Sequence, residues 1–192
     1  LEEKAKAELA LRFLTRKRLL PFVELFNPDY QAGWVHKDIC QRLEQFSKDV
    51  AEKKSPRLML FMPPRHGKST LASVAFPAWH LGRHPQHEFI SCSYSGSLAM
   101  GFSRKVRQLL REPTYKSAFK TRLDKDSQSA EAWLTTDGGG FVAAGVGGGI
   151  TGKGAHVLVI DDPVKNRDEA ESQNARDSSW DWYTSTAYTR LA

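Results

Sequence analysis

The chain has 192 residues, of which 40% are apolar and 26% are charged, a composition typical of a globular domain. It contains no run of about eighteen apolar residues, so the sequence predicts no membrane-spanning helix. Its two cysteines, Cys40 and Cys92, are isolated, which excludes a disulfide framework and favours a reducing compartment. The net charge of +6 favours a polyanionic partner but does not identify one.

The first part of the chain is predicted to be helical. Apolar residues recur at helical spacing over residues 1–20 and again over residues 36–50, and Pro21 and Pro28 interrupt the pattern between them. We therefore expect residues 1–50 to form a helical segment ahead of a separate core over residues 51–192.

The core alternates predicted strands and helices. Strands are expected at residues 57–62, 87–94 and 157–160, helices at 68–81 and 97–111, and a hairpin with strands at 133–136 and 141–144. Pro77 is expected to kink the last turn of its helix. The apolar run at 157–160 lacks alternation, which predicts a central strand buried on both faces. The pattern indicates an α/β fold with a mostly parallel sheet and helices on both faces.

A phosphate-binding loop is the first motif that carries chemistry. Between the strand at 57–62 and the next helix, the chain reads Pro64, Arg65, His66, Gly67, Lys68, Ser69, Thr70, which is typical of a Walker A loop. Backbone N–H groups there would bind phosphates, with Lys68 on the β- and γ-phosphates and Ser69 on Mg²⁺. Met62 stands where the usual pattern has its first glycine. The alternative is a solvated turn that carries this sequence by chance.

Two adjacent carboxylates form the second motif. Asp161 and Asp162 directly follow the apolar run at 157–160, as in a Walker B strand, where ligands bind at the carboxyl edge of the sheet. Asp161 is predicted to hold Mg²⁺ and Asp162 to orient and deprotonate the attacking water. An acidic turn after a strand is the alternative. Together the two motifs predict a P-loop NTPase of the RecA/ASCE-like class that uses ATP and Mg²⁺.

The combined motifs resemble the large subunit of tailed-phage terminases. The resemblance is carried by residues 62–69 (MPPRHGKS), 91–95 (SCSYS) with 98–99 and 102–104, 149–154 (GITGKG) and 160–165 (IDDPVK), and it extends from about Phe22 to the C-terminus. It implies an N-terminal ATPase domain of a motor that moves double-stranded DNA into a viral procapsid. It also implies a ring of subunits, a portal protein and a small terminase subunit as partners, and the host cytoplasm as location.

Several residue roles follow from that resemblance. Arg65 is a candidate for a γ-phosphate contact, or else a solvated loop arginine. His36 lies in a segment that resembles the adenine-recognition region, and it either binds the base or caps a helix. Lys153 lies where many relatives place a trans-acting arginine, although a lysine lacks that residue's bidentate geometry. Most terminases carry Asp-Glu where this chain has Asp161-Asp162; we assign the base to Asp162, with Glu169 as the alternative.

Terminases of this kind continue into a coupling motif and a metal-dependent nuclease domain. After Asp162 the sequence predicts only a helix-like stretch at 166–182 and a short tail, with no acidic cluster for a two-metal site. We therefore expect an ATPase domain without the nuclease domain, truncated within its core.

A basic segment is the candidate for DNA contacts. Residues 104–125 hold eight basic and two acidic residues, and the candidates among them are Arg104, Lys105, Arg107 and Arg111. A solvated helix face is the alternative explanation.

Two other functions remain open at this stage. A superfamily 2 helicase-like translocase shares the core, but its Asp-Glu-x-His or Asp-Glu-x-Asp box differs from Asp161-Asp162-Pro163-Val164. A nucleotide-binding fragment with little turnover of its own is the second.

Overall fold

The computed structural model describes residues 2–191, and the chain divides into two compact units. One comprises residues Leu1–Pro85 and Val106–Arg122, and the other Gln86–Lys105 and Leu123–Ala192. Each unit is described by itself below.

The first unit is helical. Its elements are α1 (Glu2–Lys17), α2 (Leu19–Phe26), α3 (Trp34–Ala51), the π-helix η1 (Thr70–Ala75), α4 (Phe76–Arg83), the C-terminal part of α5 (Gly96–Arg111) and α6 (Pro113–Ala118). The helices predicted over the first 20 residues and over residues 36–50 are therefore confirmed, but the predicted interruption at Pro21 is wrong: this proline lies in the first turn of α2, where its missing N–H is tolerated. Several apolar residues of α1 are exposed to solvent: Leu9, Phe13 and Leu14 are 63%, 54% and 47% exposed.

Aromatic rings form the centre of this unit. Phe22 of α2 packs edge-on against Tyr115 and Phe119, at ring distances of 6.2 Å and 6.0 Å. The buried Tyr115 hydroxyl donates a hydrogen bond to the Ala78 carbonyl over 2.8 Å. Phe119 also lies against Gly82, where an added Cβ would come within 2.6 Å of the ring. This close packing fixes α4 against α2 and α6.

The helix that follows the phosphate loop differs from its prediction in one respect. It runs from Lys68 to Arg83 as expected, but residues Thr70–Ala75 form a π-helix and Pro77 lies in the first turn of α4. The expected kink near the end of the helix is thus wrong. Proline has no N–H to donate and its ring collides with the carbonyl four residues earlier, and the wider π-turn accommodates both constraints.

The strand predicted at residues 57–62 is not formed. This segment belongs to no strand of the described sheet, and Met59 and Phe61 are 79% and 87% exposed. Lys53 and Ser55, just before it, have positive φ angles of 59° and 49°. An apolar sequence becomes a strand only when a neighbouring strand takes up its backbone hydrogen bonds, and no described residues pair with this segment in a ladder.

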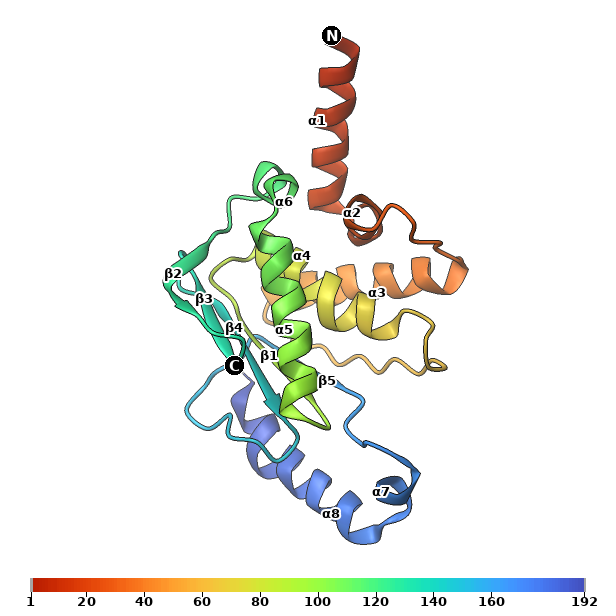
Figure 1. The fold of residues 1–192 in the computed structure, drawn as a ribbon, viewed down its shortest axis with the longest axis vertical. Helices are drawn as coiled ribbons and strands as arrows, with labels where there is room; N and C mark the ends of the chain where they lie inside the picture. The colour runs from red at the N-terminus through yellow and green to blue at the C-terminus, as the bar shows by residue number, and fades with distance from the viewer. Residues whose placement is uncertain (1, 192) are drawn as a thin grey trace. The chain divides into compact units, whose positions relative to one another are not determined.

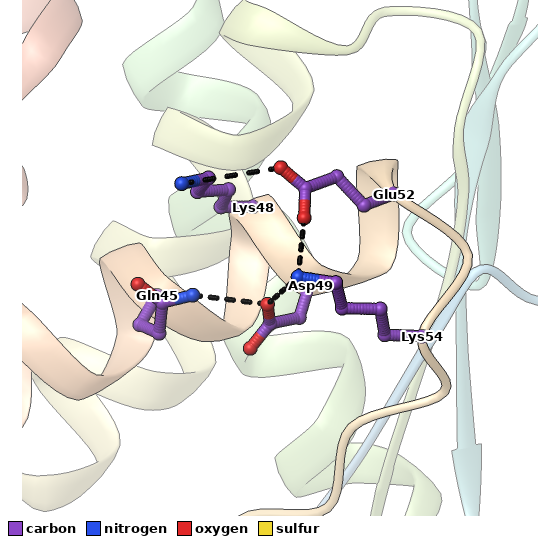
Figure 2. Close-up of polar contacts among 5 residues, drawn as sticks. All are labelled: Gln45, Lys48, Asp49, Glu52 and Lys54. Atoms are coloured by element: carbon purple, nitrogen blue, oxygen red, sulfur yellow. Dashed lines mark hydrogen bonds and ion pairs between the residues drawn. The ribbon is translucent and has the colours of Figure 1, made fainter.

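A polar network surrounds the end of α3, just before that segment (Figure 2). Gln45 donates to the Asp49 carboxylate over 2.9 Å, and the Lys54 ammonium lies 3.4 Å from the same oxygen. Lys54 also pairs with Glu52, whose other oxygen lies 3.9 Å from Lys48. Exposed ion pairs contribute little singly, but here one lysine joins two carboxylates on either side of the turn that leaves α3.

The second unit contains a five-stranded sheet (Figure 1). Its strands are β1 (Glu88–Ser93), β2 (Leu123–Gln128), β3 (Ala132–Thr135), β4 (Gly140–Gly145) and β5 (Val157–Asp161), in the order β2-β3-β4-β1-β5. β1 pairs in parallel with β4 and β5, whereas β3 is antiparallel to β2 and β4. The fold is therefore mixed α/β with a mostly parallel sheet, and the predicted hairpin and the predicted strand at 87–94 are confirmed.

The strand that carries the two carboxylates lies at an edge of this sheet. β5 pairs only with β1 among the described residues, and Leu158, Val159 and Ile160 are only half-buried. The predicted central position is thus wrong for the described sheet. A local run of apolar residues indicates burial, but strand order depends on segments elsewhere in the chain.

Three rings in neighbouring strands form the core of the sheet. Phe89 of β1, Phe141 of β4 and Trp133 of β3 are in register with one another and stack with 5.4 Å between centroids at each step. The Trp133 indole N–H donates to the Ser103 hydroxyl of α5 over 3.0 Å. Cross-strand aromatic pairs stabilise a sheet directly, so this row holds three strands and one helix together.

The rest of the second unit is helical. After β5 come α7 (Arg167–Glu171), α8 (Gln173–Trp182), a π-helix (Tyr183–Ala187) and a 3₁₀ turn (Tyr188–Arg190). Trp182 and Ala187 pack against Ile90 and Cys92 of β1. Among the described helices, none combines the length and the hydropathy that a membrane span requires.

The aromatic row leads to a stability prediction. We expect Trp133→Ala to lower the free energy of unfolding by about 3–5 kcal/mol, because it removes a fully buried ring. Leu134→Ala, at the neighbouring position that is 48% exposed, should change it by less than about 0.5 kcal/mol. Chemical denaturation of both variants measures the difference, and equal losses would show that the ring row does not stabilise the sheet.

Candidate nucleotide site

The loop at residues 64–67, just before the helix that starts at Lys68, contains two residues with a left-handed backbone. Arg65 and Gly67 have positive φ angles of 63° and 81°, a region that glycine adopts without strain. A Cβ at Gly67 would lie 3.1 Å from the Tyr30 hydroxyl. Position 67 therefore requires glycine for two reasons. Its backbone is left-handed, and the Tyr30 hydroxyl leaves little space for a Cβ.

The same loop ends at the N-terminus of a helix. Lys68 and Ser69 are the first helical residues, and the first bond of the helix runs from the Leu71 N–H to the Gly67 carbonyl over 3.0 Å. The His66 ring N–H donates to the Pro64 carbonyl over 2.8 Å, which tightens the turn. The N–H groups that open a helix have no partner within it and attract anions. The loop thus fits a phosphate group.

A shallow hollow lies beside Lys68. Residues 60–63 and Lys68 line it, and its volume is about 420 Å³. The side chains of Phe61 and Met62 contribute an apolar wall and Lys68 a cation. Ligand sites commonly combine an apolar lining with a few polar groups.

His36 contacts this loop from α3. Its Nδ1 accepts a hydrogen bond from the Gly33 N–H, and its Nε2 lies 3.0 Å from the His66 carbonyl oxygen. It therefore caps α3, one of the two roles that the sequence left open, and it contacts the phosphate loop as well. Both ring nitrogens are engaged in these bonds. The resemblance implies that His36 binds the adenine base, and a hydrogen bond to the base would need one of these nitrogens.

Tyr30 is a residue that sequence reasoning missed. Its ring meets the His36 ring edge-on, with 5.6 Å between centroids. Burial, with a smaller contribution from Cys40, raises the pKa of Tyr30 to about 12. No motif marks this tyrosine, because it comes next to the loop only through the path of the chain between α2 and α3.

The two carboxylates of the second unit lie at the end of β5. Asp161 is 5% exposed, and its carbonyl accepts a 2.7 Å hydrogen bond from the Ser93 hydroxyl. Asp162 is exposed, and its carbonyl accepts a bond from the Tyr94 N–H over 3.0 Å. Asp162 also has a φ of +47°. Aspartate tolerates this left-handed region better than glutamate does, which gives a physical reason for aspartate at this position.

Glu169, the alternative base, is engaged in the start of α7. Its carboxylate accepts from the Lys165 N–H over 2.9 Å, and the Asn166 side chain accepts from the Glu169 N–H over 3.0 Å. Asn166 therefore caps α7, and the Glu169 carboxylate binds the N–H of the residue before that cap. These contacts give Glu169 a structural role at the start of α7.

Most of the remaining candidate residues lie on exposed positions. Arg104 and Lys105 are exposed on the part of α5 in the second unit, and Arg111 is exposed on the part in the first unit, where Arg107 is half-buried. Lys153 is exposed in the glycine-rich segment between β4 and β5. The phosphate loop belongs to the first unit and Asp161, Asp162 and Lys153 to the second.

A mixed α/β fold with a glycine-containing loop that opens a helix defines the chain as a candidate nucleotide-binding protein. Residues 59–190 match a family model described as "Terminase large subunit, T4likevirus-type, N-terminal", so the chain belongs to this family, and the resemblance is confirmed. The family implies a role in viral DNA packaging, and terminase large subunits are generally ATPases. No curated protein matches the sequence at a significant level.

The backbone of the loop leads to a second prediction. Gly67→Ala should lower the free energy of unfolding by about 1–2 kcal/mol, because a left-handed backbone is costly for a residue with a Cβ. Gly101 is the matched control, since it lies within α5 and an added Cβ there meets nothing within 4 Å. Gly101→Ala should instead stabilise the protein by about 0.5–1 kcal/mol. Thermal denaturation of both variants tests the pair, and a stable Gly67→Ala protein would contradict the assigned backbone.

Proposed function

We propose that this chain is the ATPase part of a DNA-packaging motor, in which ATP hydrolysis drives double-stranded DNA into a viral procapsid. One observation carries the proposal. The left-handed Gly67 directly precedes a helix that opens with Lys68 and Ser69, in a chain of the terminase large subunit family. That combination is typical of a loop that binds nucleotide phosphates.

Different residues of the loop are proposed to bind different parts of ATP. Backbone N–H groups of residues 65–70 donate to phosphate oxygens, and Lys68 supplies the positive charge for the β- and γ-phosphates. Arg65 is held in the same turn and is a candidate for the γ-phosphate. Apolar residues 60–63 line the hollow beside Lys68, and the Lys68 ammonium supplies the charge that attracts the triphosphate.

Two oxygen donors are the proposed ligands of a magnesium ion brought in with the nucleotide. The Ser69 hydroxyl and the Asp161 carboxylate are hard oxygen donors, which Mg²⁺ prefers, and we propose that they hold it. When bound, the ion supplies charge neutralisation to the phosphates. Asp161 is 5% exposed at the end of β5, so its position is set by the strand.

Asp162 is the proposed base. Its backbone is fixed through the Tyr94 N–H, and it is exposed, so a water molecule can reach its carboxylate. It would orient that water and take its proton as the water attacks the γ-phosphate. Glu169 remains the alternative base.

Translocation requires partners beyond the chain itself. We propose a ring of subunits at a portal protein, with a small terminase subunit, acting in the host cytoplasm. Lys153 is the candidate for a charge that reaches the site of a neighbouring subunit, and the basic side chains of α5 are candidates for the DNA backbone.

The ATPase proposal leads to a test that separates binding from turnover. Asp162→Asn keeps a residue that tolerates the left-handed backbone, so it should bind Mg·ATP with nearly unchanged affinity while its kcat falls at least about 100-fold. Lys68→Ala should lose binding as well. Steady-state hydrolysis and calorimetric titration with ATP measure both effects.

Glu169→Gln serves as the matched control, because it removes one carboxylate from the same unit and should leave kcat nearly unchanged. If Glu169→Gln lost activity and Asp162→Asn kept it, the base would be Glu169. A wild-type protein that binds ATP without turnover, at every protein concentration and with DNA present, would indicate a nucleotide-binding fragment instead.

The DNA-binding proposal leads to a fourth prediction. Arg104→Ala/Lys105→Ala should weaken binding to duplex DNA of any sequence and reduce the slope of log affinity against log salt by about 2, because about 0.9 counterions are released per phosphate contact. Arg16→Ala/Lys17→Ala removes the same charge from exposed positions of α1 and should leave the slope unchanged. Fluorescence anisotropy across a salt series tests both. An equal loss in the two variants would show that net charge alone governs binding.

A further inference from the structure

We propose that His36 is a positioning residue that locks one peptide of the phosphate loop. The peptide is the one between His66 and Gly67, and the lock holds the Gly67 N–H in the orientation that binds phosphate. The inference rests on the proposed function, because it assigns the loop to ATP, but it concerns a residue of α3 and a role that acts through the backbone.

The hydrogen bonds of His36 fix its tautomer. The Gly33 backbone N–H can only donate, so the His36 Nδ1 that it contacts at 3.0 Å must be the acceptor and carries no proton. In the neutral ring the proton is then on Nε2. The Nε2–H therefore donates to the His66 carbonyl oxygen, 3.0 Å away.

This bond determines where the next N–H points. The His66 carbonyl and the Gly67 N–H belong to one planar peptide unit, and in a trans unit they point in opposite directions. The described chain has no cis peptide bond. With the carbonyl held toward His36, the Gly67 N–H points away from α3.

The loop needs such a lock because glycine does not supply one. A rotation of the 66–67 peptide changes φ at Gly67, and glycine accepts positive and negative φ almost equally well. The observed φ of +81° is therefore not enforced by the residue itself. An external hydrogen bond to the carbonyl selects one of the two orientations.

Tyr30 holds the histidine in place. Its ring packs edge-on against His36, and its hydroxyl lies 3.1 Å from the position of a Cβ at Gly67. That hydroxyl is buried and has no hydrogen-bond partner among the described residues. Tyr30 thus acts through the shape of its ring, which restricts both His36 and the glycine.

The arrangement predicts that His36 affects all nucleotides alike. Both of its ring nitrogens are taken by backbone groups, so neither is available to an adenine base. Its effect passes through the loop to the triphosphate, and a change at His36 should weaken ATP, GTP and inorganic tripolyphosphate by the same factor.

Two substitutions of His36 separate its two hydrogen bonds. In His36→Asn the short amide can still accept from the Gly33 N–H, but it does not reach the His66 carbonyl. In His36→Gln the amide NH₂ extends about as far as Nε2 and can donate to that carbonyl. We expect His36→Asn to lose between about threefold and tenfold in affinity for all three ligands, and His36→Gln to recover most of it.

Calorimetric titrations with Mg²⁺ and each ligand give these affinities, with His156→Asn as the control. His156 also accepts a backbone N–H through Nδ1, from Glu88, but it lies in the second unit, so His156→Asn should bind like the wild type. Losses in both His36 variants that are confined to ATP would identify His36 as a base-binding residue and overturn the lock. Unchanged affinities in both variants would also overturn it.

A measurement without nucleotide keeps the inference separate from the proposed function. In the free protein, NMR of the imidazole nitrogens should show a proton on His36 Nε2 and none on Nδ1. Relaxation of the Gly67 amide should reveal added motion in His36→Asn and not in His36→Gln. If the wild type bound none of the three ligands, the proposed function would fail, and these spectra would still decide whether His36 locks the peptide; an unchanged Gly67 amide would show that it does not.

Discussion

The hydrogen bond from His36 to the His66 carbonyl is the interaction on which the candidate site depends. It joins α3 to a loop that contains two left-handed residues, Arg65 and Gly67. Such a backbone persists only where its surroundings determine it. Here the determinants are a histidine fixed by its own helix cap, a tyrosine ring against that histidine, and the helix that starts at Lys68. The protein itself thus holds the loop in one conformation, which under the proposed function reduces the ordering cost of binding an anion.

The sheet of the second unit positions two carboxylates. A row of stacked rings from Trp133 through Phe141 to Phe89 holds β3, β4 and β1 in register, and β5 pairs in parallel with β1. The Ser93 hydroxyl and the Tyr94 N–H then bind the carbonyls of Asp161 and Asp162. Rigid strands place side chains more precisely than loops do. Asp162 directly follows β5 and has a positive φ angle.

The sequence predicted the regular elements well where a local signal existed. Helical spacing marked α1, α3 and α5, and the glycine run between two apolar segments marked the β3–β4 hairpin. It failed at residues 57–62 and at β5 for the same physical reason. A strand is defined by its neighbours, and an apolar run says that a segment avoids water without saying which strand pairs with it or in what order. The kink at Pro77 was predicted wrongly because the π-turn before it accommodates the missing proline N–H. The hydrophobic pattern of the sequence does not reveal such a turn.

The sequence by itself determined the motifs and the family. Pro64–Thr70 and Asp161-Asp162 are contiguous, so the chemistry predicted for them follows from residue types and spacing alone, and the match over residues 59–190 shows the family. Only the tertiary structure decided what His36 and Tyr30 contact, since about thirty residues separate each from the loop. Their roles arise from the path of the chain between α2 and α3, which brings a helix N-terminus against the loop. Contacts between segments distant in sequence follow from packing, and packing is a property of the whole fold.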